Sequence, residues 1–233
     1  MKKLIITTLV AFAALGFTFK SADCNSLLFF KEGTQTTMTS YNDDGKVTGS
    51  SKTIYSKVVK NAGSVAVTAS QENFDKKGKS STKSEYTIKC EKGTLFFDMK
   101  MALPQQQADS YKDFEMTVEG ADKEFPTNFV VGTSLKDANI KFMFKSKDGM
   151  EIPMMTTSVK ITNRKIEAKE SVTTPAGTFE CYKITEDVEM KTMFAIRAKS
   201  ISWFNAEAGT VKTESYKENG KYTGKTELTE LKK

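Results

Sequence analysis

The sequence of 233 residues contains no histidine, only three cysteines, four prolines and one tryptophan. Without histidine, the chain lacks the usual general base, the common serine and cysteine triads, and the commonest metal ligand. The cysteines are scattered, and no close-spaced pair predicts a zinc site. The sequence also has no G-x-S-x-G, no glycine-rich phosphate loop and no calcium-loop spacing. We therefore predict no catalytic residue, no cofactor and no metal site.

Carboxylate chemistry is the one enzymatic alternative that these absences leave. Glycoside-type hydrolysis needs two converging carboxylates, and the chain has 29 Asp and Glu residues. Their spacing does not single out a pair. We expect a protein that is not an enzyme, and keep an uncharacterised carboxylate-dependent hydrolase as a second alternative.

Long hydrophobic runs are also missing, except near the N-terminus. Lys2 and Lys3 precede an apolar and small-residue run over 4–19, and the polar exit 20–24 follows it. This order is typical of a secretory signal peptide, which ends in small residues. The run of about 16 residues is shorter than the ~20 that a membrane-spanning helix needs. We predict a signal peptide over 1–22 and a mature chain of 23–233, exported to the periplasm or cell envelope and not an integral membrane protein.

Cys24 lies just past the apolar run, where a lipid-modified cysteine would lie. Such a site needs a small neutral residue directly before the cysteine, and Asp23 does not fit. The soluble exported form is therefore favoured over a lipid anchor at Cys24. Cleavage after Ala22 would keep Cys24 in the mature chain, whereas an alternative cut after Cys24 would remove it.

Three cysteines, Cys24, Cys90 and Cys181, are an odd number for an oxidising compartment. They suggest one disulfide and one buried thiol, and the sequence allows three pairings. We favour Cys24–Cys90, because that bridge would tie a fraying N-terminus onto the sheet. Cys181 stands beside Tyr182 and close to Phe179, and is expected to be a small buried hydrophobe rather than a reactive thiol.

The net charge of +6 falls to +3 when Lys2, Lys3 and Lys20 leave with the signal peptide. The lysines are spread evenly, and no basic stripe with interleaved aromatic residues is present. We therefore expect no nucleic-acid partner. An even spread of lysine favours a well-solvated surface instead.

Glycine-containing turns divide the mature chain into segments with the composition of β-strands. Asp-Gly and Asn-Gly pairs supply the positive φ that tight hairpin turns need. Residues alternate between apolar and polar along several segments, as in Ile140, Phe142 and Phe144 with Lys141 and Lys145 opposite. The predicted turns lie at 42–45, 61–63, 76–78, 91–93, 147–149 and 218–220. We predict an all-β fold: a single antiparallel β-meander domain with a strongly curved sheet or partly open barrel, and one short helix or loop crossover near 104–116.

Methionine is abundant, with 11 residues, and several of them fall on the predicted inner faces. Methionine is flexible and polarisable, and is over-used on surfaces that accommodate varied apolar ligands. We predict an apolar lining formed by Met99, Met101, Phe142, Phe144 and Trp203. Plain filling of the core is the alternative, and copper(I) capture by thioethers is a further one.

The C-terminal third carries the most distinctive sequence of the mature chain. Pro175-Ala176-Gly177-Thr178-Phe179 is followed by an aromatic strand at Trp203-Phe204, and then by Gly209-Thr210-Val211-Lys212 before the last hairpin. With the opening Asp23-Cys24 and Phe30-Lys31-Glu32-Gly33-Thr34, this pattern resembles the TapB-like exported β proteins, part of a broad domain family of unknown function. The resemblance implies an envelope β protein with a curved sheet or partly open barrel, and no established activity.

The sequence therefore favours a non-enzymatic protein of the cell envelope that binds a hydrophobic or lipid-like ligand in its interior. An envelope structural or protein-interaction domain with a filled core is the alternative. The partner is accordingly a hydrophobic small molecule or an envelope protein, and neither is identified by the residues.

Overall fold

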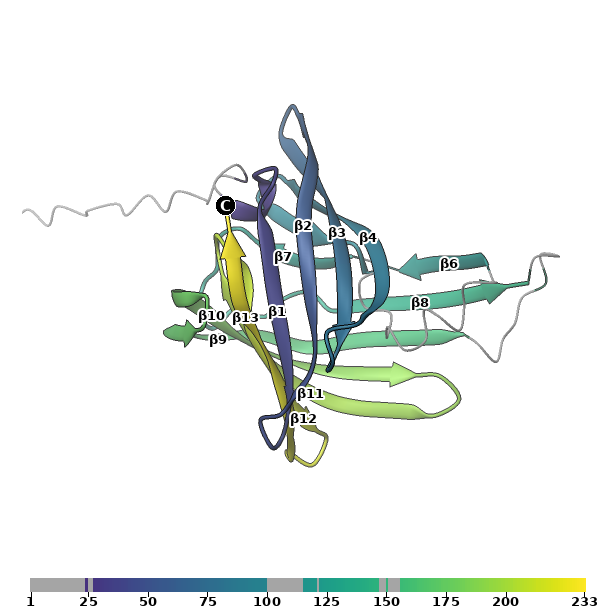
Figure 1. The fold of residues 1–233 in the computed structure, drawn as a ribbon. Helices are drawn as coiled ribbons and strands as arrows, with labels where there is room; N and C mark the ends of the chain where they lie inside the picture. The colour runs from purple at the N-terminus through teal and green to yellow at the C-terminus, as the bar shows by residue number, and fades with distance from the viewer. Residues whose placement is uncertain (1–23, 25–26, 100–114, 121, 147–149, 151–155) are drawn as a thin grey trace, which may run out of the picture.

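The computed structural model describes residues 24, 27–99, 115–120, 122–146, 150 and 156–233. Thirteen strands form one sheet in the order β6-β8-β9-β10-β11-β12-β13-β1-β2-β3-β4-β5-β7. Every neighbouring pair is antiparallel. The strands are β1 (Gln35–Asn42), β2 (Val47–Asn61), β3 (Ser64–Asp75), β4 (Ser80–Glu91), β5 (Thr94–Phe97), β6 (Glu115–Gly120), β7 (Lys123–Pro126), β8 (Ala138–Lys145), β9 (Thr157–Thr174), β10 (Gly177–Lys191), β11 (Ala195–Asn205), β12 (Gly209–Lys217) and β13 (Tyr222–Lys232). The predicted all-β antiparallel fold with a strongly curved, unclosed sheet is confirmed (Figure 1).

Turn chemistry and alternation explain most of the hairpins. Gly45, Gly63, Gly78, Gly93 and Gly220 all have positive φ and stand in the connections between consecutive strands. Within β8, alternate apolar side chains are buried and the lysines between them are not. The predicted turn at 147–149 and the predicted signal peptide, 1–22, lie outside the described residues.

The meander is interrupted between β5 and β8. β5 pairs with β7, whereas β6 pairs with β8, and β6 and β7 form the two opposite edges of the sheet. The chain therefore crosses between the edges three times in this region. The helix or loop crossover predicted near 104–116 falls on residues outside the described ones, apart from 115 and 116, where β6 begins.

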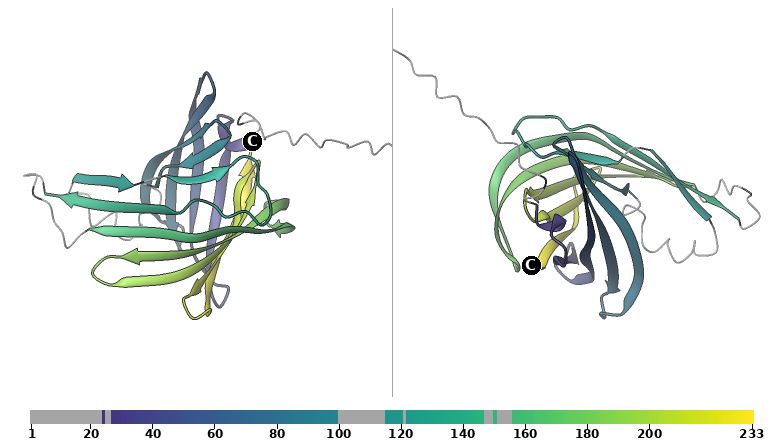
Figure 2. Two further views of the ribbon diagram at one scale, coloured as in Figure 1. Left: turned by 180° about the vertical axis from the view of Figure 1, so that it is seen from behind. Right: turned by 90° about the horizontal axis from the view of Figure 1, so that it is seen from above.

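The curvature of the sheet folds its two halves into crossing layers. In Figure 1, β1–β4 run upright while β8–β11 run across the view, and β12 and β13 form the corner that joins them. The view from above in Figure 2 shows the same bend. A main core fills the space between the layers, and both halves of the sheet contribute buried side chains to it. Its buried members are Leu27, Phe29, Phe30, Tyr55, Val65, Val67, Ala69, Tyr86, Ile88, Cys90, Leu95, Phe125, Phe129, Leu135, Ile166, Ile184 and Phe204.

Edge strand β7 packs onto the inner face of β9–β11 through aromatic stacking. The ring centroids of Phe125 and Phe204 lie 5.3 Å apart with an interplanar angle of 10°. Phe129, just after β7, stacks on both Phe204 and Tyr182, at 5.1 and 4.9 Å. Offset aromatic stacking adds about 0.5–1.5 kcal/mol per pair beyond the buried area. The stack therefore holds one edge of the sheet over strands that belong to the other half.

A buried ion cluster lies beside this stack. Lys123 of β7 places Nζ 2.7 Å from Glu186 Oε1, and Arg164 Nε of β9 lies 3.5 Å from Glu186 Oε2. The Arg164 guanidinium also lies 4.7 Å from the Phe125 ring centroid and donates from Nη1 to the Lys136 carbonyl. Burial lowers the pKa of Lys123 and of Arg164, and the Glu186 carboxylate opposes both shifts. Glu186 is thus the counter-charge that allows two cations to be enclosed.

Two irregularities in β9 direct Arg164 inward. The register of β9 against β10 shifts before Ile184 and again after Thr185, and Asn163 adopts a positive φ of 52°. Such bulges bend a strand and re-aim its side chains. The backbone of 132–135 then bonds to Arg164 and Ile166, for example Leu135 N to the Arg164 carbonyl at 2.8 Å.

The N-terminal segment is attached to the core by a disulfide and by the short η2 turn, Leu28–Phe30. Cys24 is bonded to Cys90 at the end of β4, and Leu28 N donates to the Glu207 carbonyl at 2.9 Å. Leu27, Phe29 and Phe30 are all buried in the main core. The bridge therefore fixes the segment that leads into β1.

We expect Cys24→Ser and Cys90→Ser each to lower the free energy of unfolding by about 2–4 kcal/mol, because the bridge closes a loop between residues 66 positions apart. Urea denaturation of the exported protein measures this. The double variant should lose no more than either single one. Thiol titration of the denatured wild type should find Cys181 alone, and three free thiols would contradict the pairing.

Glu186→Gln should lower the free energy of unfolding by about 3–5 kcal/mol, because it leaves two enclosed cations without their counter-charge. Glu167→Gln on β9 is the matched control: its partner Lys165 is exposed, and the loss should stay below about 1 kcal/mol. Equal stability of the Glu186 variant and wild type would show that the cluster does not hold β7 in place.

Candidate functional site

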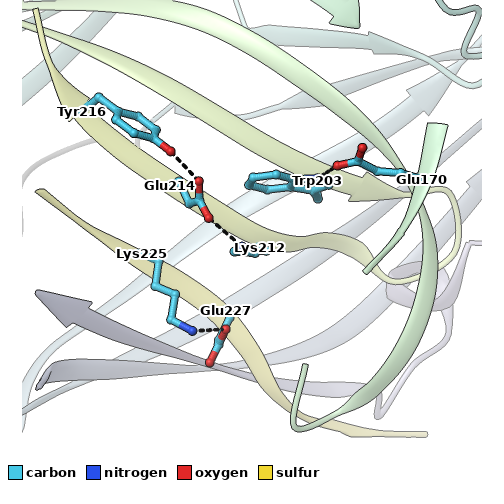
Figure 3. Close-up of polar contacts among 7 residues, drawn as sticks. All are labelled: Glu170, Trp203, Lys212, Glu214, Tyr216, Lys225 and Glu227. Atoms are coloured by element: carbon cyan, nitrogen blue, oxygen red, sulfur yellow. Dashed lines mark hydrogen bonds and ion pairs between the residues drawn. The ribbon is translucent and has the colours of Figure 1, made fainter. Parts of the chain in front are cut away.

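A charged stripe crosses the C-terminal strands on one face of the sheet, and Figure 3 shows its side chains. Trp203 faces Lys212 across β11 and β12, and Lys212 faces Glu227 across β12 and β13. Cross-strand partners share a face, as do alternate residues of one strand. The stripe consists of Glu170, Trp203, Lys212, Glu214, Tyr216, Lys225 and Glu227. Acidic, basic and aromatic groups therefore alternate along it.

Trp203 is enclosed by the stripe and is only 7% exposed. Its indole Nε1 donates a hydrogen bond to Glu170 Oε1. The ammonium groups of Lys212 and Lys183 lie 4.5 and 5.8 Å from the ring centroid, within the range of cation–π attraction. The ring is therefore occupied by partners from this chain and does not offer a free platform.

Glu214 is held by two donors from its own strand. Lys212 Nζ lies 2.6 Å from its carboxylate, and the Tyr216 hydroxyl donates to it. Burial alone would raise the pKa of Glu214, but these two hydrogen bonds outweigh burial and lower it. The hydrogen bond to the carboxylate in turn raises the pKa of Tyr216 to about 12. At neutral pH the pair is therefore a carboxylate and a neutral phenol.

The third pair, Lys225 and Glu227, lies on β13 with 2.7 Å between nitrogen and oxygen. The hydrogen bond to Glu227 raises the pKa of Lys225, whose ammonium also lies 5.0 Å from the Tyr41 ring centroid. All three carboxylates of the stripe thus have a donor, and both of its lysines have a carboxylate. The acidic and basic groups of the stripe are therefore paired with one another, which suits binding rather than proton transfer.

Neither the free thiol nor the acidic residues of the described ranges form a reactive or metal-binding site. Cys181 is fully buried, and burial raises the pKa of its thiol to about 12, so it is not a nucleophile at neutral pH. Over the ranges that the structure describes, no three histidine, cysteine, aspartate or glutamate side chains gather closely enough to hold a metal ion.

A hollow of about 400 Å³ opens beside Tyr216, at the end of the stripe. Most of its lining residues are polar by type, although their carbon atoms supply more of its surface than their polar atoms do: Asn163, Thr185, Glu186, Asp187, Lys199, Ser200, Ile201, Tyr216 and Gly220. A second hollow of about 390 Å³ lies over β2–β4 and is lined by residues such as Lys52, Gln71 and Glu85. Neither of these two hollows is lined by a residue of the predicted apolar set.

The structure does not gather the predicted apolar lining around one space. Met99, Phe142 and Phe144 are buried together with Ile140 and Val159 in a wing core over β8 and β9. Trp203 belongs to a separate cluster with Cys181, Val211 and Leu228. Met101 lies outside the described residues. The predicted inward position of Trp203 is wrong: its neighbour Phe204 faces the main core, so Trp203 lies on the opposite face of the sheet. Strands β9 and β10 also separate β8 from β11.

Sequence analysis missed the buried ion cluster of Lys123, Arg164 and Glu186. A compositional signal was available: of 35 basic residues, only Arg164 and Arg197 are arginines. The planar guanidinium is better suited to enclosed ion pairs than the ammonium of lysine. In a chain that otherwise uses lysine, this signal singles out Arg164 correctly, whereas Arg197 forms its ion pairs at the surface.

Comparison with solved structures supports the fold. A protein from Bacteroides fragilis, described as exported and with a YmcC-like fold, is 21% identical and has a TM-score of 0.72; the match covers 87% of this chain and 97% of that one. A protein from Parabacteroides distasonis, described as a lipoprotein, is 23% identical with the same TM-score and covers 88% of this chain and 99% of that one. No curated protein matches the chain. In the described parts of the chain, no helix has the length and apolar character needed to span a membrane.

The family is given by the sequence itself. Residues 31–228 match the DUF3108-like family, a span that begins before β1 and ends within β13. This supports the expected family without an assigned activity, while the narrower TapB-like resemblance stays a prediction. The match covers every strand from β1 to β12 and the first part of β13, and the chain belongs to the DUF3108-like family.

Proposed function

We propose that the chain is an exported, non-catalytic domain of the cell envelope that fills its own core and acts by binding other molecules at its surface. One observation carries this proposal: the inward-facing aromatic residues pack on one another. Phe125, Phe129, Phe204 and Tyr182 form a continuous stack in the main core. Phe142 and Phe144 are buried in the wing core.

This proposal favours the filled-core alternative over an interior ligand. A ligand that occupied the predicted lining would have to separate buried side chains that already touch apolar neighbours. Opening such a core exposes apolar surface at about 25 cal/mol per Å². The polar, paired groups of the charged stripe and its hollow are, in contrast, at the surface and need no opening.

The directions of the pKa shifts in the stripe and at Cys181 support the non-enzymatic part of the proposal. Active sites tend to contain groups whose pKa is moved toward the working pH. Here the pKa of Glu214 is lowered, and those of Tyr216 and Cys181 are raised to about 12. All three shifts move the groups away from neutral pH.

Export as a soluble protein is also favoured by the Cys24–Cys90 bridge. Lipid modification of an N-terminal cysteine forms a thioether at the same sulfur that a disulfide uses. Cys24 cannot hold both bonds. We infer that this chain works in the envelope without a lipid anchor at Cys24.

Native mass spectrometry of the exported protein, extracted without denaturant, tests the filled core. We expect the mass of the polypeptide alone, less two hydrogens for one disulfide, and no added mass after incubation with fatty acids or phospholipids. A fatty acid or phospholipid that remains bound in stoichiometric amount would contradict the filled core. An added diacylglyceryl mass at the N-terminus would contradict the unanchored form.

A further inference from the structure

The hairpin between β10 and β11 ends in apolar side chains that the core does not use. Met193, Phe194 and Ile196 are 68%, 77% and 64% exposed. Ile196 pairs across the sheet with Met190, which pairs with the buried Val159. The wing core therefore continues along this row of the sheet until it reaches solvent at the hairpin.

Strands β8 and β9 reach the same end of the sheet. Lys141, Ser158, Lys191 and Ala195 are successive cross-strand partners, so the ends of β8 and β10 lie level with the starts of β9 and β11. Figure 1 shows the β10–β11 hairpin projecting away from the corner formed by β12 and β13. Met150, in the connection after β8, is 71% exposed.

Positive charge lies behind the apolar tip on one face of the sheet. Lys141 and Lys191 share the face opposite Ile196, and Lys160 and Arg197 follow on the next row of the same face. Arg197 is paired with Glu189 and Glu218, at 2.8 and 3.7 Å. Four basic groups thus stand against two acidic ones behind the exposed apolar residues.

We propose that this hairpin tip binds the surface of an anionic lipid bilayer, with Met193, Phe194 and Ile196 inserted among the lipids and the basic groups on the headgroups. The inference rests on the proposed function, because it names one molecule that the surface binds. Protruding apolar side chains insert into the headgroup boundary, and nearby Lys and Arg add attraction to anionic lipids. A stable protein interface buries about 800 Å² per partner, more than a tip of a few side chains offers.

The test is vesicle binding by the exported protein. Wild type should co-sediment with vesicles of phosphatidylglycerol mixed with phosphatidylethanolamine, and more weakly with phosphatidylcholine alone. Met193→Ser combined with Phe194→Ser should lower the partition coefficient at least about tenfold, because two apolar side chains are lost from the lipid. The matched control is Val47→Ser combined with Val59→Ser, which changes two exposed valines of β2 and should leave binding unchanged.

A fluorescence experiment shows directly whether the tip enters the bilayer. Phe194→Trp in a Trp203→Phe background carries a single tryptophan at the tip, and its emission should shift to the blue and be quenched by brominated lipid chains. A stable fold in both backgrounds is checked by thermal unfolding; if Trp203→Phe fails to fold, the wild-type background serves, because Trp203 is buried.

Several outcomes would overturn the inference: no vesicle binding by wild type, equal binding by the tip variant, or a tip tryptophan that stays in water. None of these would bear on the filled core, which native mass spectrometry tests separately. Native mass spectrometry of the tip variant keeps the two claims apart. A lipid that still binds this variant in stoichiometric amount lies in the core and overturns the proposed function, whereas a lipid that binds wild type alone lies at the tip.

Discussion

The pairing of β1 with β13 is the constraint on which the rest of the fold depends. Gln35–Asn42 pairs with the last strand of the chain, from Gly224 to Lys232, and this seam lies in the middle of the sheet. Without it the sheet would separate into a seven-stranded and a six-stranded piece. Gly224, with φ of 149°, marks how closely the strands approach, since a Cβ there would overlap the Tyr41 carbonyl oxygen. Side-chain hydrogen bonds between Thr39 and Thr229 and between Ser40 and Thr226 add to the pairing.

The sheet bends at the corner formed by β12 and β13 (Figure 1), next to the seam, and this curvature creates both the core and the enclosed ion cluster found among the described residues. Because the N-terminal layer crosses the C-terminal one, β7 can place Phe125 on Phe204 and Lys123 on Glu186. Enclosing three charges costs desolvation that the ion pairs only partly offset. The cluster therefore contributes specificity: it fixes where β7 lies on β9–β11. The same curvature leaves the far ends of β8–β11 projecting, which is why the apolar hairpin tip is exposed (Figure 2).

The hairpins were predictable from the sequence, whereas the long-range placements were not. Gly45, Gly63 and Gly220 stand in turns whose chemistry is local. The four-residue β7 has no such local pattern, and its position is decided by what Phe125 stacks on. Alternation gave the inward face of Phe142 but not that of Trp203, because in β11 the inward residue is the neighbouring Phe204. The predicted apolar lining is therefore divided between two clusters on opposite faces of the sheet. The inward turn of Arg164 depends on register shifts in β9. These shifts change the phase of the alternation: residues 157, 159 and 161 are buried before them, and residues 164 and 166 after them.

Native-state hydrogen exchange measured by mass spectrometry tests the seam most directly. If β1 and β13 join the two halves into one cooperative unit, their amides should exchange only through global unfolding. Peptides from β1 and β13 should then show the same free energy of opening as peptides from β3 and β12. Exchange of β1 and β13 well ahead of β3 and β12 would show that the halves are stable without the seam, and would contradict the account.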